Sequence, residues 1–269
     1  MDFKFRARAG AFACLIASAI TMSAHGAPAA TYIFNNNFNA VESGVAPLTS
    51  VDPLGFGAFQ TATVFGTPRT TWHFDGASTP ASQGGLNFNT TGLIPSNNYS
   101  VEMVFELTGS LGWRRLLDSL DRQSDSGLYI DPNSALNLFP NANGAGGLFV
   151  ANSFFDVFVT IDPFNTVTGY LNGAQQFSTT STNLDVATNT LGFFLDNFFG
   201  GGLDEWSSGN VALIKVFNSA LTPSEVMTAT ADPFAGTTPT STVPEPGTLL
   251  LLGLGLAIAG FVQQRHRKT

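Results

Sequence analysis

The chain has 269 residues, of which 43% are hydrophobic and only 11% are charged, and its formal net charge is −8 at pH 7. One cysteine and three histidines supply few ligands for a thiolate or imidazole metal centre. Only 5 of the 11 basic residues lie between positions 30 and 242, against 17 of the 19 acidic residues. Because this central region is so acidic, we exclude nucleic acid as a partner.

The N-terminus has the pattern of a secretory signal peptide. Lys4, Arg6 and Arg8 precede an apolar run over residues 9–22, and small residues follow at 24–30. This pattern predicts that residues 1–29 are a signal peptide, cleaved after Gly26 or Ala29. The only cysteine lies inside it, so the exported chain is expected to contain no disulfide.

Residues 30–230 have the pattern of one large β-domain. Short runs rich in β-branched and aromatic residues are separated by turn residues, with almost no 3.6-residue periodicity, which predicts a sandwich or barrel. In Tyr99–Leu107, Glu102 and Glu106 alternate with apolar residues, so a half-buried strand with one solvent-facing side is expected. Residues 155–161, 166–171 and 175–177 predict a three-stranded meander whose last turn is Asn172-Gly173. Further strands are expected at residues 32–34, 71–74, 86–89, 115–120, 127–130, 191–195 and 210–217.

One helix is predicted after these strands. Thr222 is a helix N-cap residue, Pro223 suits the first helical position, and Glu225 completes a capping box. The helix is expected to end near Thr230. Residues 231–242 are rich in Thr and Pro, which is typical of a linker.

The C-terminal residues 243–269 have the pattern of an anchor. Val243, Pro244, Glu245 and Pro246 precede an uncharged segment over residues 247–262. As a helix at ~1.5 Å per residue it would span roughly 24 Å, which is short of the ~30 Å hydrocarbon core but can insert if its ends snorkel. A buried core helix is the alternative interpretation. The basic residues Arg265, Arg267 and Lys268 are expected to stay cytoplasmic, which places the preceding domain across the membrane.

This three-part tail resembles the PEP-CTERM sorting signal of Gram-negative bacteria. The resemblance implies that an exosortase, a membrane transpeptidase-like enzyme, recognises the signal and cuts near Pro244–Pro246. It also implies that the protein is passed from the inner membrane to the cell surface or the extracellular space, often alongside exopolysaccharide production.

The order of motifs in the β-domain is similar to that of the LamG-like, concanavalin A-like lectin/glucanase superfamily. The resemblance is carried by residues 72–76, by Tyr99–Leu107, by residues 157–173 and by the closing segment 209–226. It implies a jelly roll of two packed antiparallel sheets. Lectins, adhesion modules, enzymes and structural spacers share this fold, so the resemblance alone does not give the function.

The residues argue against an enzyme. Glucanases of this superfamily use clustered carboxylates, for which Glu102 and Glu106 are the nearest match. Four residues along a strand separate them by about 13 Å, whereas glycosidase carboxylates lie roughly 5 to 9.5 Å apart. His73 is the one histidine available for a triad, and no Gly-x-Ser-x-Gly elbow accompanies it. We therefore predict no catalytic residues and interpret the two glutamates as solvent-facing.

Two binding sites are predicted from residue type. Asp196, Asp204 and Glu205 flank a glycine-rich loop that could bring their carboxylates together around Ca²⁺, with solvated loop acids as the alternative. Trp113 and Trp206 are candidates for stacking on sugar rings, with a structural role as the alternative.

The sequence as a whole thus predicts a secreted, sorted surface or matrix protein with a non-catalytic binding domain, and carbohydrate or exopolysaccharide as its ligand. A glucanase-like hydrolase and a purely structural matrix component are the alternatives.

Overall fold

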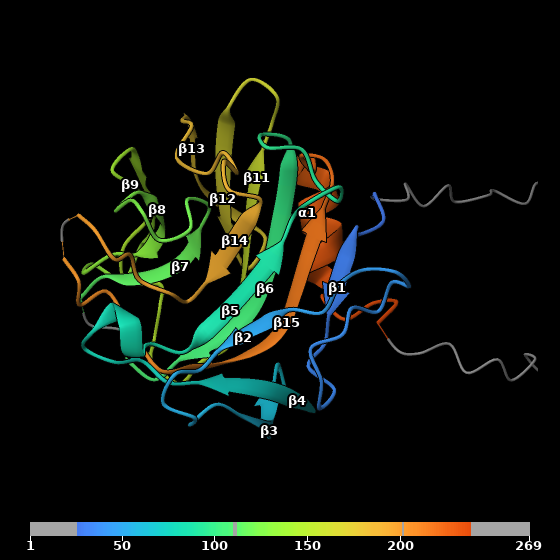
Figure 1. The fold of residues 1–269 in the computed structure, drawn as a ribbon. Helices are drawn as coiled ribbons and strands as arrows, with labels where there is room; N and C mark the ends of the chain where they lie inside the picture. Colours follow the sequence, from blue (N-terminus) through green and yellow to red (C-terminus); the bar gives the residue numbers. More distant parts are fainter. Residues whose placement is uncertain (1–25, 110–111, 201, 238–269) are drawn as a thin grey trace, which may run out of the picture.

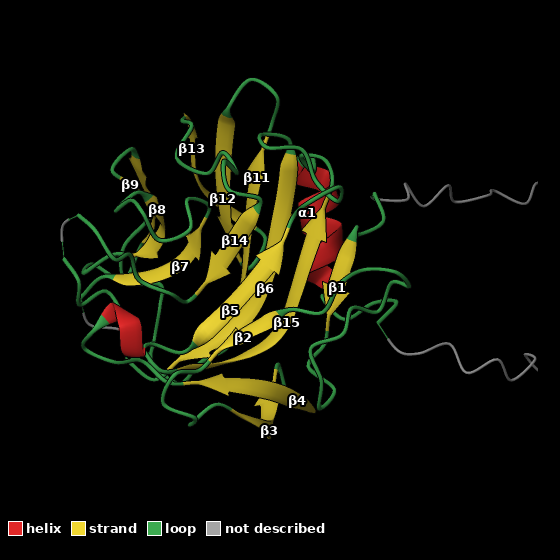
Figure 2. Cartoon of the chain, in the orientation of Figure 1, coloured by secondary structure: helices red, strands yellow, loops and turns green. Residues whose placement is uncertain are grey.

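The computed structural model describes residues 26–109, 112–200 and 202–237. Two antiparallel sheets pack face to face as a β-sandwich, which confirms the predicted jelly roll (Figures 1 and 2). Residues 1–25 of the predicted signal peptide 1–29 and the whole predicted sorting segment 243–269 lie outside the described residues. Within the described ranges, no helix is long and apolar enough to cross a membrane.

The first sheet has eight strands in the described chain, in the order β13-β12-β11-β6-β15-β4-β3. Strand β15 pairs with β4 through its first residues and with β1 through its later ones, so β1 completes the same edge. The strands are β1 (Ala30–Tyr32), β3 (Ala58–Val64), β4 (Thr67–Phe74), β6 (Tyr99–Leu107), β11 (Phe155–Ile161), β12 (Thr166–Leu171), β13 (Ala174–Thr180) and β15 (Gly209–Phe217).

The second sheet has seven described strands in the order β10-β9-β8-β7-β14-β5-β2. A short 3₁₀ helix at Pro80–Ser82 precedes β5. The strands are β2 (Thr49–Val51), β5 (Gly85–Asn89), β7 (Arg114–Asp118), β8 (Gly127–Ile130), β9 (Leu136–Phe139), β10 (Ala142–Asn143) and β14 (Thr190–Phe193).

The predicted meander is present as β11, β12 and β13, with the register that its turns require. Asn172 and Gly173 both have positive φ, at 48° and 79°, as a two-residue hairpin turn demands. The sequence did not indicate β2, β3, β9 or β10. Strand β3 was not predicted because it lies mostly exposed at the sheet edge, and its Gln and Thr residues give no clear alternation of apolar and polar side chains.

The main core lies between the sheets. Val101, Met103, Phe105 and Leu107 of β6 point into it, as their alternation predicts, and all are buried. At about 25 cal/mol per Å² of apolar surface, such fully buried side chains contribute about 1.5–3 kcal/mol each. This core fixes which residues of β6 and its neighbours lie on the outer face of the first sheet.

Helix α1 (Pro223–Ala231) covers part of that outer face beside β15 (Figure 1). Its capping box forms as predicted: the Glu225 amide donates to Thr222 Oγ1, and the Thr222 amide donates to Glu225 Oε2. Val226 and Ala229 of the helix pack with Phe158, Tyr170, Phe217 and Leu221.

The chain after α1 continues along the same face rather than leaving the domain at residue 231. Phe234 packs against Val64, Val104, Ala212 and Leu213, and Thr237 is buried. The packed domain therefore extends at least six residues into the segment expected to be a linker. We refer to residues 232–237 as the C-terminal segment.

Candidate functional site

The predicted calcium ligands and stacking residues lie at one rim of the sandwich, whereas the predicted sorting and anchor residues lie outside the described residues. The Arg115 amide donates to the Glu205 carbonyl over 3.0 Å, which sets the segment around Trp113 beside that around Asp204. Burial lowers the pKa of the Arg114 guanidinium, and the nearby Asp204 carboxylate partly opposes this shift. We call this group the rim; it comprises Trp113, Arg114, Asp196, Phe199, Asp204, Glu205 and Trp206.

The two predicted stacking residues are each half-buried, with part of the ring engaged by the protein. Trp113 packs edge-to-face against Tyr129 and Phe139, with ring centroids 5.7 and 5.3 Å apart. Trp206 lies directly on the backbone of Gly76, where a β-carbon would come within 2.2 Å of the ring. Phe199 is more open, at 62% exposure. The rim thus presents aromatic side chains in positions held by packing, as a sugar-stacking surface requires.

The three predicted calcium ligands have different surroundings. Both carboxylate oxygens of buried Asp196 already accept backbone N–H groups, from Asn197 at 2.8 Å and Glu205 at 3.1 Å. Asp204 is exposed. Glu205 is buried, and its Oε2 meets no hydrogen-bond partner among the described residues. Burial, followed by the charges of Asp125 and Asp196, raises the pKa of Glu205 to about 8.

The three predicted calcium ligands are not grouped as a metal centre would require in the described part of the chain. In the described ranges, no group of three or more His, Cys, Asp or Glu side chains is placed to hold a metal ion. The calcium site therefore stays a prediction based on residue type.

Beneath the rim lies a buried network of arginines and carboxylates. Arg115 donates to Asp118 Oδ1 over 2.7 Å, to Asn197, and to the carbonyls of Ser124 and Ser126. Arg122 Nε donates to the Asp196 carbonyl, and its amide donates to Asp118 Oδ2. Two guanidinium groups thus face two carboxylates, and all four carboxylate oxygens accept a hydrogen bond. This network fixes the loops that carry the rim.

The outer face of the first sheet corrects the expectation that Glu102 faces solvent. Glu102 is fully buried and forms an ion pair with Lys215 of β15 at 3.1 Å. Lys215 also donates to the Pro233 carbonyl of the C-terminal segment. The alternation of β6 was interpreted correctly, but α1 and the C-terminal segment cover the face that alternation alone would leave to water.

Glu106, further along the same strand, belongs to a separate polar network. It accepts from Asn210 Nδ2 over 2.7 Å, and Asn210 Oδ1 faces His73 Nδ1 at 3.0 Å. His73 Nε2 lies 3.5 Å from Asp75. These contacts give half-buried His73 a structural role.

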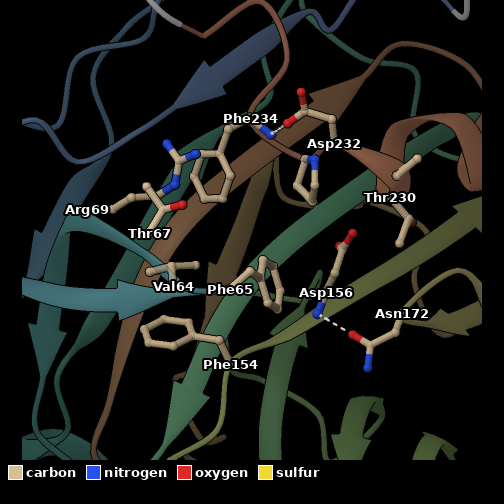
Figure 3. Close-up of a pocket in the computed structure, with 12 residues that line it drawn as sticks. Val64, Phe65, Thr67, Arg69, Phe154, Asp156, Asn172, Thr230, Asp232 and Phe234 are labelled. Atoms are coloured by element: carbon tan, nitrogen blue, oxygen red, sulfur yellow. Dashed lines mark hydrogen bonds between the residues drawn. The ribbon is translucent and has the colours of Figure 1, made fainter.

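A cavity of about 670 Å³ opens between the β3–β4 hairpin and the end of α1 (Figure 3). The hairpin contributes Phe65 and Arg69, β11 contributes Asp156, and Phe234 comes from the C-terminal segment. Figure 3 shows the Asp156 carboxylate directed toward the space between Phe65, Thr230 and Phe234. The cavity is also lined by Val64, Thr67, Phe154, Asn172, Ala231, Asp232 and Pro233.

Asp156 is the unusual group of this cavity. The residue is only 2% exposed, and neither carboxylate oxygen has a hydrogen-bond partner within the described part of the chain. Burial, reinforced by the charge of Glu102, raises the pKa of Asp156 well above its ordinary value. The Thr230 hydroxyl lies near enough to oppose this shift, but its geometry falls short of a full hydrogen bond.

The hairpin that carries Phe65 has an unusual backbone. Val64 pairs with Thr67, so Phe65 and Gly66 form a two-residue turn, with φ of 47° and 83°. Such turns favour Asn or Gly at the first position because positive φ is costly for a bulky side chain. The ring of Phe65 is nevertheless half-exposed at the cavity. A strained aromatic residue beside a cavity is a feature that functional sites often show.

The comparisons with known proteins bear on the domain and the tail separately. A family model described as "Concanavalin A-like lectin/glucanases superfamily" matches residues 80–227. The chain belongs to this superfamily. The PEP-CTERM protein-sorting motif matches residues 242–268, which indicates an exported, C-terminally anchored protein. No curated protein gives a significant match.

Solved structures show the same fold at low identity. Domain 4 of AbnA, a GH43 extracellular arabinanase from Geobacillus stearothermophilus, was solved in complex with arabinotriose. It matches with a TM-score of 0.56 and 16% identity, over 76% of this chain and 98% of that domain. The binding domain of Botulinum neurotoxin DC, solved with rat synaptotagmin II, matches with a TM-score of 0.53 and 12% identity. The match covers 76% of this chain but only 51% of the toxin domain, so our chain spans about half the length of that domain.

Sequence reasoning missed the cavity residues of this superfamily member. Asp156 sits out of phase with inward-pointing Val157 and Val159, which could have placed it on the outer face. Nothing in the sequence showed that the C-terminal segment covers that face. The Phe65-Gly66 pair was a weaker signal, because an aromatic residue before glycine is an uncommon hairpin turn.

Proposed function

We propose that this protein is an exported surface or matrix protein, processed by an exosortase, whose β-sandwich binds carbohydrate without catalysing a reaction. Membership in a lectin/glucanase superfamily together with a sorting motif is the observation that carries the proposal. Arabinotriose in the complex of the similar arabinanase domain supports a carbohydrate as ligand. Exopolysaccharide is the polymer class that we expect.

We place the carbohydrate at the rim. Trp113 and Phe199 offer aromatic surface there, and Arg114 with Asp204 offers hydrogen-bonding groups for sugar hydroxyls. The buried arginine network below holds these loops in place. A preorganised surface of this kind binds with a smaller loss of conformational entropy than a flexible loop would.

The surroundings of the acidic residues support binding rather than hydrolysis. Glu102 is engaged by Lys215, and Glu106 is engaged by Asn210. Neither is therefore free to act as a general acid or a nucleophile across a groove, and their separation along β6 exceeds that of glycosidase pairs.

The test is a glycan array and an exopolysaccharide pull-down with the purified full-length protein. We expect retention of polysaccharide that weakens at least tenfold in Phe199→Ala and Trp113→Ala. Phe164→Ala is the matched control, since Phe164 is 83% exposed at the β11–β12 turn. Because Trp113→Ala removes packing, the melting temperature of this variant is measured as well. If Trp113→Ala is unfolded, the result for Phe199→Ala alone decides whether the rim binds polysaccharide.

The outcomes separate the alternatives. Release of soluble sugar by the purified protein would favour the hydrolase over our proposal. Absence of binding to every glycan and to exopolysaccharide would leave a purely structural matrix role and overturn the proposal.

A further inference from the structure

The cavity beneath the C-terminal segment contains three acceptor atoms that lack a partner among the described residues. They are Asp156 Oδ1, Asp156 Oδ2 and Thr230 Oγ1. Leaving a buried polar atom unsatisfied is costly, and folded proteins rarely do so without a reason. The three atoms lie together at the wall that β11 and α1 form, next to a space large enough for a small ligand.

The charges around the cavity leave Asp156 in surplus. Its neighbour Glu102 on β6 already has Lys215 on β15 as its partner at 3.1 Å, so the buried group holds two acids and one base. Arg69, the other nearby base, stacks on the ring of Phe234, with its guanidinium carbon 3.5 Å from the ring centroid. Exposed Asp232 lies at the other end of Phe234 and accepts from the Phe234 amide at 3.3 Å (Figure 3).

The remaining walls suit a cation that carries an organic group. Phe65, Phe154 and Phe234 line the cavity, and aromatic faces attract ammonium groups through the quadrupole of the ring. Thr67 also lines the cavity and carries a hydroxyl, and Arg69 Nε is a buried donor without a partner in the described chain. These groups suit hydroxyls next to the ammonium rather than a bare methylene chain.

We propose that this cavity binds a primary ammonium group, and that the group belongs to an amino sugar. An ammonium has three N–H donors, which match the three unsatisfied acceptors, and its charge compensates the surplus carboxylate. The choice of a sugar as the bearer rests on the proposed function, whereas the ammonium itself follows from the cavity alone. Neither the family match nor the sorting motif assigns a ligand to these residues.

The protonation of Asp156 gives the binding a characteristic pH dependence. Because burial and the charge of Glu102 raise its pKa, Asp156 keeps its proton to a higher pH than an ordinary carboxyl group, and an incoming ammonium must displace that proton wherever it is present. Affinity is therefore expected to increase with pH until the amine of the ligand loses its own proton. Binding in the acid range releases a proton, which calorimetry in buffers of different ionisation enthalpy detects.

The experiment is calorimetric titration of the full-length protein with a glucosamine tetramer and with the matching N-acetylglucosamine tetramer. We expect the amine form to bind at least tenfold more tightly, with proton release below neutral pH. Asp156→Asn keeps the shape of the side chain, removes its charge and breaks no hydrogen bond of the carboxylate, so we expect it to fold and to lose that preference. Thr230→Val should lose a smaller part of the preference for the amine tetramer, because it removes only one of the three acceptor atoms.

Asp121→Asn is the matched control. It removes the same charge from an exposed residue outside the cavity, and its positive φ of 52° is well tolerated by Asn. Its titration should equal that of the unaltered protein. A melting curve for each variant shows whether it is folded.

The inference is overturned if both tetramers bind equally, or if folded Asp156→Asn keeps the preference for the amine. Tighter binding of a lysine-bearing peptide than of the amino sugar would overturn the assignment to a sugar. Neutral glycans that bind through Trp113 and Phe199 but independently of Asp156 support the proposed function even then, so the two failures are distinguishable.

Discussion

The chain buries carboxylates in two regions, and they are satisfied in different ways. Beneath the rim, Asp118 and Asp196 face Arg115 and Arg122, and all their carboxylate oxygens accept hydrogen bonds. Under the C-terminal segment, Glu102 and Asp156 share only Lys215, and both oxygens of Asp156 lack partners in the described chain.

The difference teaches which buried acids hold the fold and which are available for a ligand. A buried network in which every carboxylate oxygen accepts a hydrogen bond gives rigidity, and its charges cannot be reassigned without loss. A carboxylate that is equally buried but accepts no hydrogen bond costs free energy in the folded protein. We propose that a bound ligand offsets this cost at Asp156. Burial alone does not separate the two kinds, whereas hydrogen bonding and charge balance do.

The largest expected effect is the loss of the satisfied network. Arg115→Met leaves Asp118 buried without its ion-pair partner and removes four hydrogen bonds, so the free energy of unfolding should fall by about 3–5 kcal/mol. Urea denaturation measures it. Arg114→Met, whose half-buried guanidinium donates to the Trp113 carbonyl, is the control and should lose no more than about 1 kcal/mol. If both variants lose the same free energy of unfolding, the buried network contributes no more to stability than a half-buried arginine does.

Calcium tests whether the carboxylates of the rim bind a cation, as we propose for the cavity. If Asp196, Asp204 and Glu205 bind it, calcium at 100 times its Kd should add about 2.7 kcal/mol to the free energy of unfolding. EDTA should reverse the shift, and Glu205→Gln should abolish it. The measurement is thermal melting with and without chelator. An unchanged melting temperature would contradict the predicted calcium site at the rim.

Both regions contribute to a dependence of stability on pH. The folded protein keeps a proton on Glu205 up to about pH 8, whereas an unfolded glutamate loses it near pH 4.3. This contribution is fully present below the unfolded value and is lost as the pH rises through the folded value. Glu102 and Asp156 shift in the same direction because of burial.

We therefore expect Glu205 alone to lower the free energy of unfolding by about 4 kcal/mol between pH 5 and pH 8, since a difference of one bound proton changes it by about 1.4 kcal/mol per pH unit. Urea denaturation at constant ionic strength provides the measurement. Glu205→Gln should make this fall less steep over the whole range from pH 5 to pH 8, because over most of it Glu205 is ionised in the unfolded chain and protonated in the folded protein. Stability that is constant over this range would show that these carboxyl groups titrate normally.

The smallest expected effect concerns the strained turn at the cavity. Phe65→Asn relieves the positive φ of a bulky residue, so it should stabilise the domain by about 1 kcal/mol. The same variant should weaken amino-sugar binding, because a cavity wall is lost. The melting temperature and the calorimetric titration together test this. Destabilisation would instead indicate that Phe65 serves packing.

The sequence predicted the long strands well because their side chains alternate clearly. The ranges expected for Tyr99–Leu107, Gly127–Ile130, Phe155–Ile161 and Thr166–Leu171 agree with β6, β8, β11 and β12. It missed β3, whose polar residues lie at a sheet edge, and β2, β9 and β10, which are short. Edge and short strands carry little periodic signal, since too few of their side chains are buried.

The rim residues were named from residue type, and the fold then placed them side by side. Trp113 and Glu205 are ninety residues apart in the chain, and a backbone hydrogen bond from Arg115 brings their segments together. Residue type alone could not show that both Asp196 oxygens are already used by backbone amides. That depends on how the loop closes, which is a tertiary property.

The sequence by itself determined the class of fold, the capped helix and the sorting tail, because each follows from local spacing, alternation or composition. Only the tertiary structure decided that the outer face of β6 is covered, that Glu102 is paired with Lys215, and that Asp156 is left without a partner. The physical reason is that alternation assigns a residue to a face of the sheet. What packs on that face depends on a chain segment more than seventy residues away.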